Sequence, residues 1–200
     1  MFQSIDPGRL QSCVFDRWSP QIGDPSLAGW LTVAAYLTCA VLAIFVVRRV
    51  GGGRARTFWV LTCFAMAFLA VNKQLDLQSA LTATGRCIAR LQGWYEDRRI
   101  VQRHFIQGLL LAIGAILVFG LYLMRRDLKR HGLALLGLAV VAGFVAVRAV
   151  GFHHFDSVIN IRVQDVRLNV VFELAGLVLI AVNALVLLLR QPGHQRARRN

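Results

Sequence analysis

The sequence predicts an all-α protein, an integral membrane bundle of five transmembrane helices. Hydrophobic residues make up 56% of the 200-residue chain and the mean hydropathy is +0.56, far above the usual balance of a soluble domain. Five stretches also approach the roughly 20 apolar residues that a helix needs to cross the hydrocarbon core of a bilayer. We expect these transmembrane helices at residues 27–47, 57–78, 104–124, 133–152 and 167–189.

The predicted bundle is a single domain, residues 27–190, with a tail at each end. Residues 1–26 lack the charged start, apolar stretch and small-residue cleavage site of a signal peptide, so we expect them to be retained as an outward-facing tail. Residues 191–200 form a short basic tail. The net charge of +13 would favour nucleic acid in a soluble protein, but here the basic residues flank apolar spans. We therefore expect the lipid bilayer as a partner, and no nucleic acid.

The second predicted helix, 57–78, ends in polar residues. Its apolar part is too short to cross unless Asn72, Lys73 and Asp76 also lie at membrane depth. Asn72, Asp76 and Ser79 recur at helical spacing, which places them on one face. Charged groups at that depth are costly and normally face the interior of a bundle, paired with one another. This pattern therefore predicts a buried polar site.

The connection to the third helix reads CIARLQGWYEDRRIVQRHF, residues 87–105. Ile88, Leu91, Trp94 and Tyr95 follow one side of it, and arginines occupy the rest. This pattern is typical of a short interfacial helix with aromatic residues at headgroup depth. Such a helix would either cover the polar residues as a lid or complete the bundle.

The third and fourth helices add polar residues on the same side of the membrane. Because successive helices alternate in direction, the start of helix 104–124 and the end of helix 133–152 lie on one side. The polar residues at these two ends are His104, Arg148, His153, His154 and Asp156.

The fifth predicted helix carries one polar stripe along an otherwise apolar surface. Its members are Asn169, Glu173, Gly176 and Asn183, at helical spacing. We expect the stripe to face protein and the apolar sides to face lipid. Glu173 lies about one turn inside the membrane, near the depth expected for the polar end of the second helix.

Basic residues indicate the orientation of the bundle. The connections 48–56 and 125–132 and the tail 190–200 are short and dense in arginine, and they fall on one side. Twelve of the 23 Lys and Arg lie there and eleven on the other side, but only Asp127 among the 10 acidic residues joins the dense group. This density predicts an N-terminus outside and a C-terminus in the cytoplasm. His131 and His194 stand among these arginines, and we expect both to be solvated.

Two of the 4 cysteines, Cys13 and Cys87, then share the outer compartment, whereas Cys39 and Cys63 fall inside helices. An oxidising exterior would let Cys13 and Cys87 form a disulfide. Two free thiols are the alternative.

One interpretation of the ionisable residues on the outer side is a metal site. The candidate ligands are His104, His153, His154 and Asp156. Three protein ligands with one open position is the arrangement of catalytic zinc, whose bound water becomes a nucleophile near neutral pH. Asp76 or Glu173 would then be the general base. Such a site would hydrolyse an ester, amide or phosphate at the outer leaflet.

Other interpretations stay open. Lys73 or Arg148 can form structural ion pairs with the carboxylates, which would fix the helices without doing chemistry. The chain would then be an accessory or assembly subunit of a larger membrane complex. Binding of haem b through His104 and one of the paired histidines, or of another small ligand, is a further alternative.

The motifs NKQLDLQ (72–78), GWYEDRR (93–99) and FHHFD (152–156) together resemble a group of small multi-pass bacterial inner-membrane proteins. The resemblance covers the second to the fifth helix. It implies a bacterial origin and a location in the cytoplasmic (inner) membrane, and it brings no assigned activity and no site residues.

Overall fold

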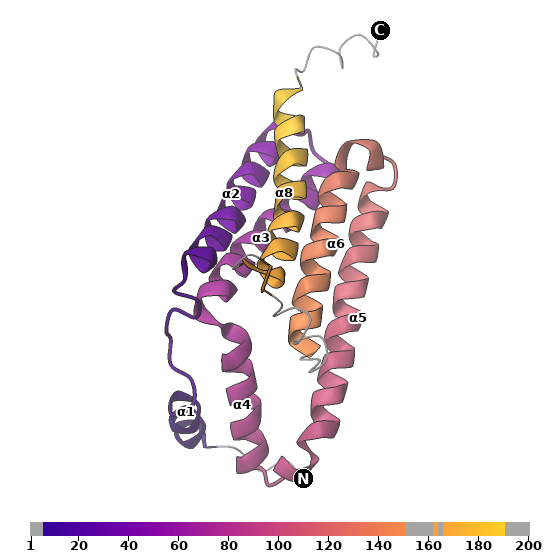
Figure 1. Cartoon of the computed structure of the whole chain (residues 1–200). Helices are drawn as coiled ribbons and strands as arrows, with labels where there is room; N and C mark the ends of the chain where they lie inside the picture. The colour runs from indigo at the N-terminus through magenta and orange to yellow at the C-terminus, as the bar shows by residue number, and fades with distance from the viewer. Residues whose placement is uncertain (1–5, 151–161, 164–165, 191–200) are drawn as a thin grey trace.

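The structure, a computed structural model, describes residues 6–150, 162–163 and 166–190 (Figure 1). Within these ranges five helices are long and apolar enough to cross a membrane. They are α2 (Leu27–Arg49), α3 (Arg54–Leu75), α5 (Arg98–Met124), α6 (Leu128–Val150) and α8 (Leu168–Leu189). The predicted all-α bundle of five transmembrane helices is therefore confirmed.

The remaining elements are short. They are α1 (Pro7–Phe15), α4 (Leu77–Leu91), the 3-10 helix η1 (Tyr95–Asp97), and two strands, β1 (Arg162–Val163) and β2 (Val166–Arg167). The strands pair antiparallel, with Arg162 opposite Arg167 and Val163 opposite Val166. They directly precede α8.

The core lies where α2, α3, α6 and α8 pack together, with α8 between α2 and α6 (Figure 1). Its largest fully buried side chains include Tyr36, Trp59 and Met66. The crossing of α6 and α8 depends on two glycines. A Cβ at Gly137 would lie 2.6 Å from the backbone oxygen of Gly176, and one at Gly176 would lie 2.7 Å from Val141. Only glycine lets the two helices approach this closely.

Helix α5 is the most peripheral of the five spans. It packs against α6 and α3, and only 6% of its apolar membrane-spanning stretch is buried inside the bundle. Its start at Arg98 lies six residues before the predicted boundary at 104. The predicted start of the fourth span is also late, since α6 begins at Leu128 rather than 133.

Helices α1 and α4 lie beyond one end of the bundle, opposite the end where α8 terminates (Figure 1). The two helices pack against each other. A disulfide joins Cys13 to Cys87, with their Cα atoms 6.0 Å apart, so the pairing that the sequence allowed is present in the structure. Helix α1 is therefore held against α4 both by packing and by a covalent bond.

The predicted short helix between the second and third spans is present, but its bounds differ from the expected residues 87–105. The helix here is α4, which runs from Leu77 to Leu91, and a turn at Gly93 with φ of 78° separates it from α5. Trp94 therefore lies in the turn rather than on a helical face, and Tyr95 lies in η1. Helix α4 packs on α1. Its described side chains line no part of the small polar cavity that lies between α2, α3, α6 and α8.

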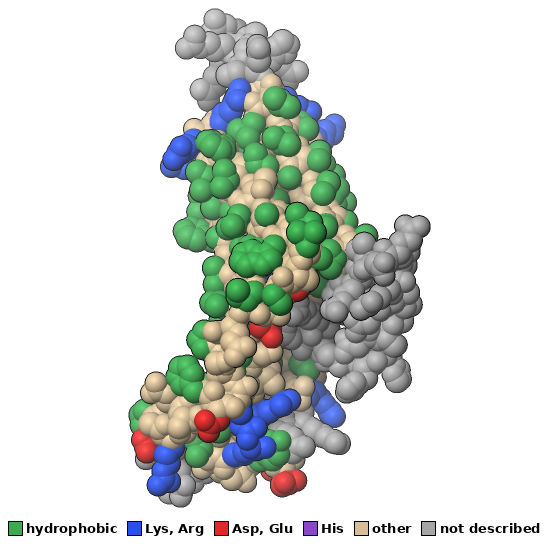
Figure 2. Space-filling model, turned by 60° about the vertical axis from the view of Figure 1, so that its left-hand side comes forward, with side chains coloured by type: hydrophobic (Ala, Val, Ile, Leu, Met, Phe, Trp, Pro, Cys, Tyr) green, Lys and Arg blue, Asp and Glu red, His purple; other side chains and the backbone are tan. Residues whose placement is uncertain are grey.

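Charge is distributed unevenly along the bundle. Figure 2 shows a belt of hydrophobic side chains with Lys and Arg above it, near the end of α8. We call this the arginine-rich end; its described basic residues are Arg48, Arg49, Arg54, Arg56, Arg125, Arg126, Lys129, Arg130 and Arg190. The only described acidic residue in these connections is Asp127.

Candidate functional site

A buried ion pair joins α3 to α8. Lys73 Nζ lies 2.9 Å from Glu173 Oε2, and the two side chains are only 7% and 4% exposed. Lys73 comes from the last turn of α3 and Glu173 from the second turn of α8. Two charges at this depth are tolerated because each neutralises the other.

Tyr36 extends the pair to a third helix, α2. Its hydroxyl donates a hydrogen bond of 2.9 Å to Glu173 Oε1, and its side chain is fully buried. Each carboxylate oxygen of Glu173 therefore has its own donor. We refer to Tyr36, Lys73 and Glu173 as the buried network. Hydrogen bonds to an ionised carboxylate are stronger than neutral ones, so the network fastens three helices at one level.

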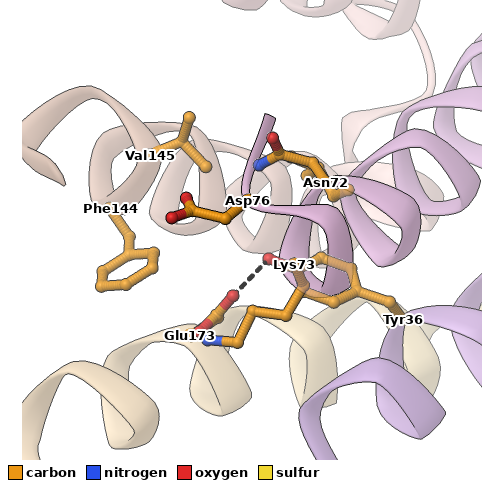
Figure 3. A pocket seen from close by; sticks show the side chains of 8 residues that line it. Tyr36, Asn72, Lys73, Asp76, Phe144, Val145 and Glu173 are labelled. Atoms are coloured by element: carbon orange, nitrogen blue, oxygen red, sulfur yellow. Dashed lines mark hydrogen bonds and ion pairs between the residues drawn. The ribbon is translucent and has the colours of Figure 1, made fainter. Parts of the chain in front are cut away.

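A small cavity lies beside the buried network (Figure 3). Its lining also includes Leu69, Asn72, Asp76, Phe144 and Val145. The cavity has about 20 Å³ of water-accessible space. That is enough for about one water molecule.

Asp76 reaches this cavity because the backbone breaks there. Its φ of 46° and ψ of 52° are left-handed, a conformation that Asp tolerates better than most residues, and it ends α3 and starts α4. Its carboxylate points toward Phe144 and Val145 of α6 (Figure 3). The connection between α1 and α2, residues 16–26, contacts the chain beside this break, where the Gly23 N–H donates to the Gln74 carbonyl at 2.6 Å.

The predicted continuous face through Asn72, Asp76 and Ser79 is therefore wrong in part. Asn72 and Asp76 both line the cavity. Ser79 belongs to α4, past the break, and is exposed, with its hydroxyl donating to Asp76 Oδ2 at 2.6 Å. A left-handed residue changes the direction of the helix axis, so helical spacing does not carry across it.

The amide of Gln74 stands out beside this break. Both its Oε1 and Nε2 atoms are buried, and neither has a hydrogen-bond partner among the residues that the structure describes. Unsatisfied buried amides are uncommon because each costs free energy.

His104, the one candidate metal ligand that the structure describes, lies apart from the cavity lining. Its ring is exposed, and Nδ1 is 2.8 Å from the Ile100 carbonyl of its own helix. His153, His154 and Asp156 lie outside the described residues, as do the side chains of Arg148 and Asn169. Within the part of the chain that is described, no three His, Cys, Asp or Glu residues form a group that could hold a metal ion. The described donors do not by themselves fit zinc.

A second buried polar cluster lies toward the arginine-rich end, and one prediction fails there. His131 was expected to be solvated, but it is only 3% exposed. Because α6 begins early, His131 falls in its first turn, and its Nδ1 accepts the indole N–H of Trp59 at 3.1 Å. The Asn183 amide donates to the Arg130 carbonyl at 2.8 Å and accepts from the Ala134 N–H at 3.2 Å, so it satisfies backbone groups at the same helix start.

Tyr36 and Trp59 were missed by the sequence analysis. Both stand in apolar stretches where an aromatic residue is ordinarily a packing residue. Asn183 on the polar stripe of α8 was the one indication of a polar neighbour in this region, and it bonds to the backbone of Arg130 and Ala134.

Comparison with known proteins gives no family model, no curated protein and no solved structure that matches this chain.

Proposed function

We propose that this multi-pass membrane protein is a non-catalytic accessory or assembly subunit of a larger membrane complex. In this proposal the buried network holds the helices in place and does no chemistry. The observation that carries the proposal is the pairing of Glu173, whose two carboxylate oxygens accept hydrogen bonds from Tyr36 and Lys73.

The size and burial of the site support this view. A general base must reach the proton that it removes, directly or through one water. Glu173 is almost fully buried, and the neighbouring cavity has space for about one water molecule rather than a substrate. To act as a base, Glu173 would have to accept a proton at an oxygen that already accepts a hydrogen bond from Tyr36 or Lys73. A satisfied ion pair that fixes which helix faces which requires no such change.

The metal-dependent hydrolase stays a prediction. It depends on His153, His154 and Asp156, which lie outside the described residues, and on His104, whose described ring nitrogen contacts its own backbone. Zinc would be bound there if those residues lie close together in space. Haem b would need only His104 and one of the paired histidines.

The location is also part of the proposal. We place the protein in a bacterial cytoplasmic membrane with its C-terminus in the cytoplasm. The arginine-rich end supports a cytoplasmic position for that side. The disulfide between Cys13 and Cys87 lies at the other end, as expected for an oxidising compartment.

Affinity purification from the native membrane in a mild detergent tests the proposal. We expect the chain to be recovered with at least one other membrane subunit in fixed stoichiometry. Elemental analysis of the same preparation gives a second readout. A chain recovered alone that holds one equivalent of zinc, with the zinc lost in His153→Ala, would refute the accessory role and support the hydrolase.

A further inference from the structure

Two arginines from different elements meet at one aromatic ring at the arginine-rich end. The guanidinium carbon of Arg54 lies 5.8 Å from the centre of the Tyr122 ring, and that of Arg125 lies 4.6 Å from it. Arg54 is the first residue of α3, and Arg125 follows the last residue of α5. Stacking on an aromatic face orders a guanidinium group and leaves its N–H donors free for another partner.

Among the described residues, no ion pair involves either of these two arginines. Lys73 pairs with Glu173, and Arg9 pairs with Asp6 near α1, both far along the chain from this ring. Asp127 is the only acidic residue in the connections of this end, against nine described basic residues. Arg54 and Arg125 therefore lack a counter-ion within the described part of the chain.

The start of α3 adds positive potential at the same place. Its N-cap residue, Gly53, supplies no side-chain hydrogen bond, and its first turn contains Arg54 and Arg56 but no acidic residue. The N-terminus of a helix already carries partial positive charge and favours anions. Arginines at this position add to the positive potential of the helix N-terminus, and the resulting repulsion would be reduced by a bound anion.

Apolar side chains lie next to this charge. On α5, Val118, Phe119 and Leu121 are all exposed within one turn of Tyr122, which is itself half exposed. This places a positive group beside surface that suits acyl chains, at the level where lipid headgroups meet the hydrocarbon core. A free anion would contact only the arginines. A phospholipid would contact the arginines through its phosphate and the apolar side chains of α5 through its acyl chains.

We propose that Arg54, Arg125 and the Tyr122 ring form a binding site for the phosphate of an anionic phospholipid, whose acyl chains lie along α5. This inference is independent of the accessory role. Planar guanidinium groups suit phosphate because they present paired N–H donors. Because each of the two arginines would lie directly beside the phosphate, removing one should weaken binding about fivefold and removing both about 25-fold.

Lipid titration of the purified full-length chain in detergent, followed by native mass spectrometry, tests the site. The probes are phosphatidylglycerol and phosphatidylcholine with the same acyl chains. We expect the first bound phosphatidylglycerol to be at least tenfold tighter than phosphatidylcholine, and Arg54→Gln with Arg125→Gln to remove most of that preference. Equal affinity for the two lipids would overturn the proposal.

Arg48→Gln is the matched control, because it removes the same charge from the same end without touching Tyr122. It should change binding less than twofold, and a loss equal to that of Arg125→Gln would show general attraction instead of a site. Tyr122→Phe should bind normally and Tyr122→Leu weakly, since the ring face orders both arginines. Inorganic phosphate that displaces the lipid at equal concentration would overturn the assignment to phospholipid. Normal elution on size exclusion confirms that each variant is folded.

Discussion

Replacing Lys73 with methionine removes the positive charge that faces Glu173 and keeps a side chain of similar length. Both groups are at least nine-tenths buried and lie 2.9 Å apart, so among the described residues the change leaves the buried carboxylate with only the Tyr36 hydroxyl as a partner. Removing one member of a buried ion pair typically costs about 3–5 kcal/mol. We expect Lys73→Met to lower the free energy of unfolding by an amount in this range.

The removal of Tyr36's hydroxyl gives a graded comparison. Tyr36→Phe deletes one hydrogen bond to a charged group but leaves the ion pair intact, which should cost about 1.5–3 kcal/mol. Unfolding by sodium dodecyl sulfate in mixed micelles, followed by tryptophan fluorescence, measures both variants. The reasoning would be refuted if Lys73→Met were within about 1 kcal/mol of the wild type, or less harmful than Tyr36→Phe.

Three further changes test other parts of the fold. Gly137→Ala should destabilise the bundle by about 1–3 kcal/mol because the new Cβ would meet backbone 2.6 Å away, while Gly143→Ala, with nothing within 4 Å, should be neutral or slightly stabilising in the same assay; equal effects would contradict the close crossing of α6 and α8. Replacing Cys13 and Cys87 with serine removes a link across 74 residues, and it should raise hydrogen exchange in α1 but not in α3; unchanged exchange in α1 would count against the link. Gln74→Leu should stabilise the protein by about 1 kcal/mol because it removes an unsatisfied amide, and a loss of that size would mean that the amide has a polar partner.

Much of the architecture could be predicted because apolar length and charge density are local properties of the sequence. The stripe on α8 is an example. Helical spacing alone placed Glu173, Gly176 and Asn183 on a face turned toward protein, and in the structure Glu173 and Asn183 are buried while Gly176 contacts α6. The pair of Lys73 and Glu173 was one of several ion pairs that the sequence left open, because a charge at that depth requires a partner.

The rest depended on information that spacing does not contain. The break at Asp76 is a single left-handed residue, and no proline or glycine marks it. It moved Ser79 out of the site and turned α4 toward α1. Tyr36 meets Glu173 because α2 packs against α8. The presence of a tyrosine on an apolar helix does not reveal that packing. His131 was misplaced because the predicted start of its helix was five residues late.

Recovery of the native complex from a strain that carries Lys73→Met together with Glu173→Gln tests the central claim most directly. The double change removes both charges but keeps an acceptor for the Tyr36 hydroxyl. If the network only positions helices, the complex should be recovered at close to the wild-type amount, in contrast to Lys73→Met alone. A double variant that inserts and folds normally but yields no complex would contradict a purely structural role.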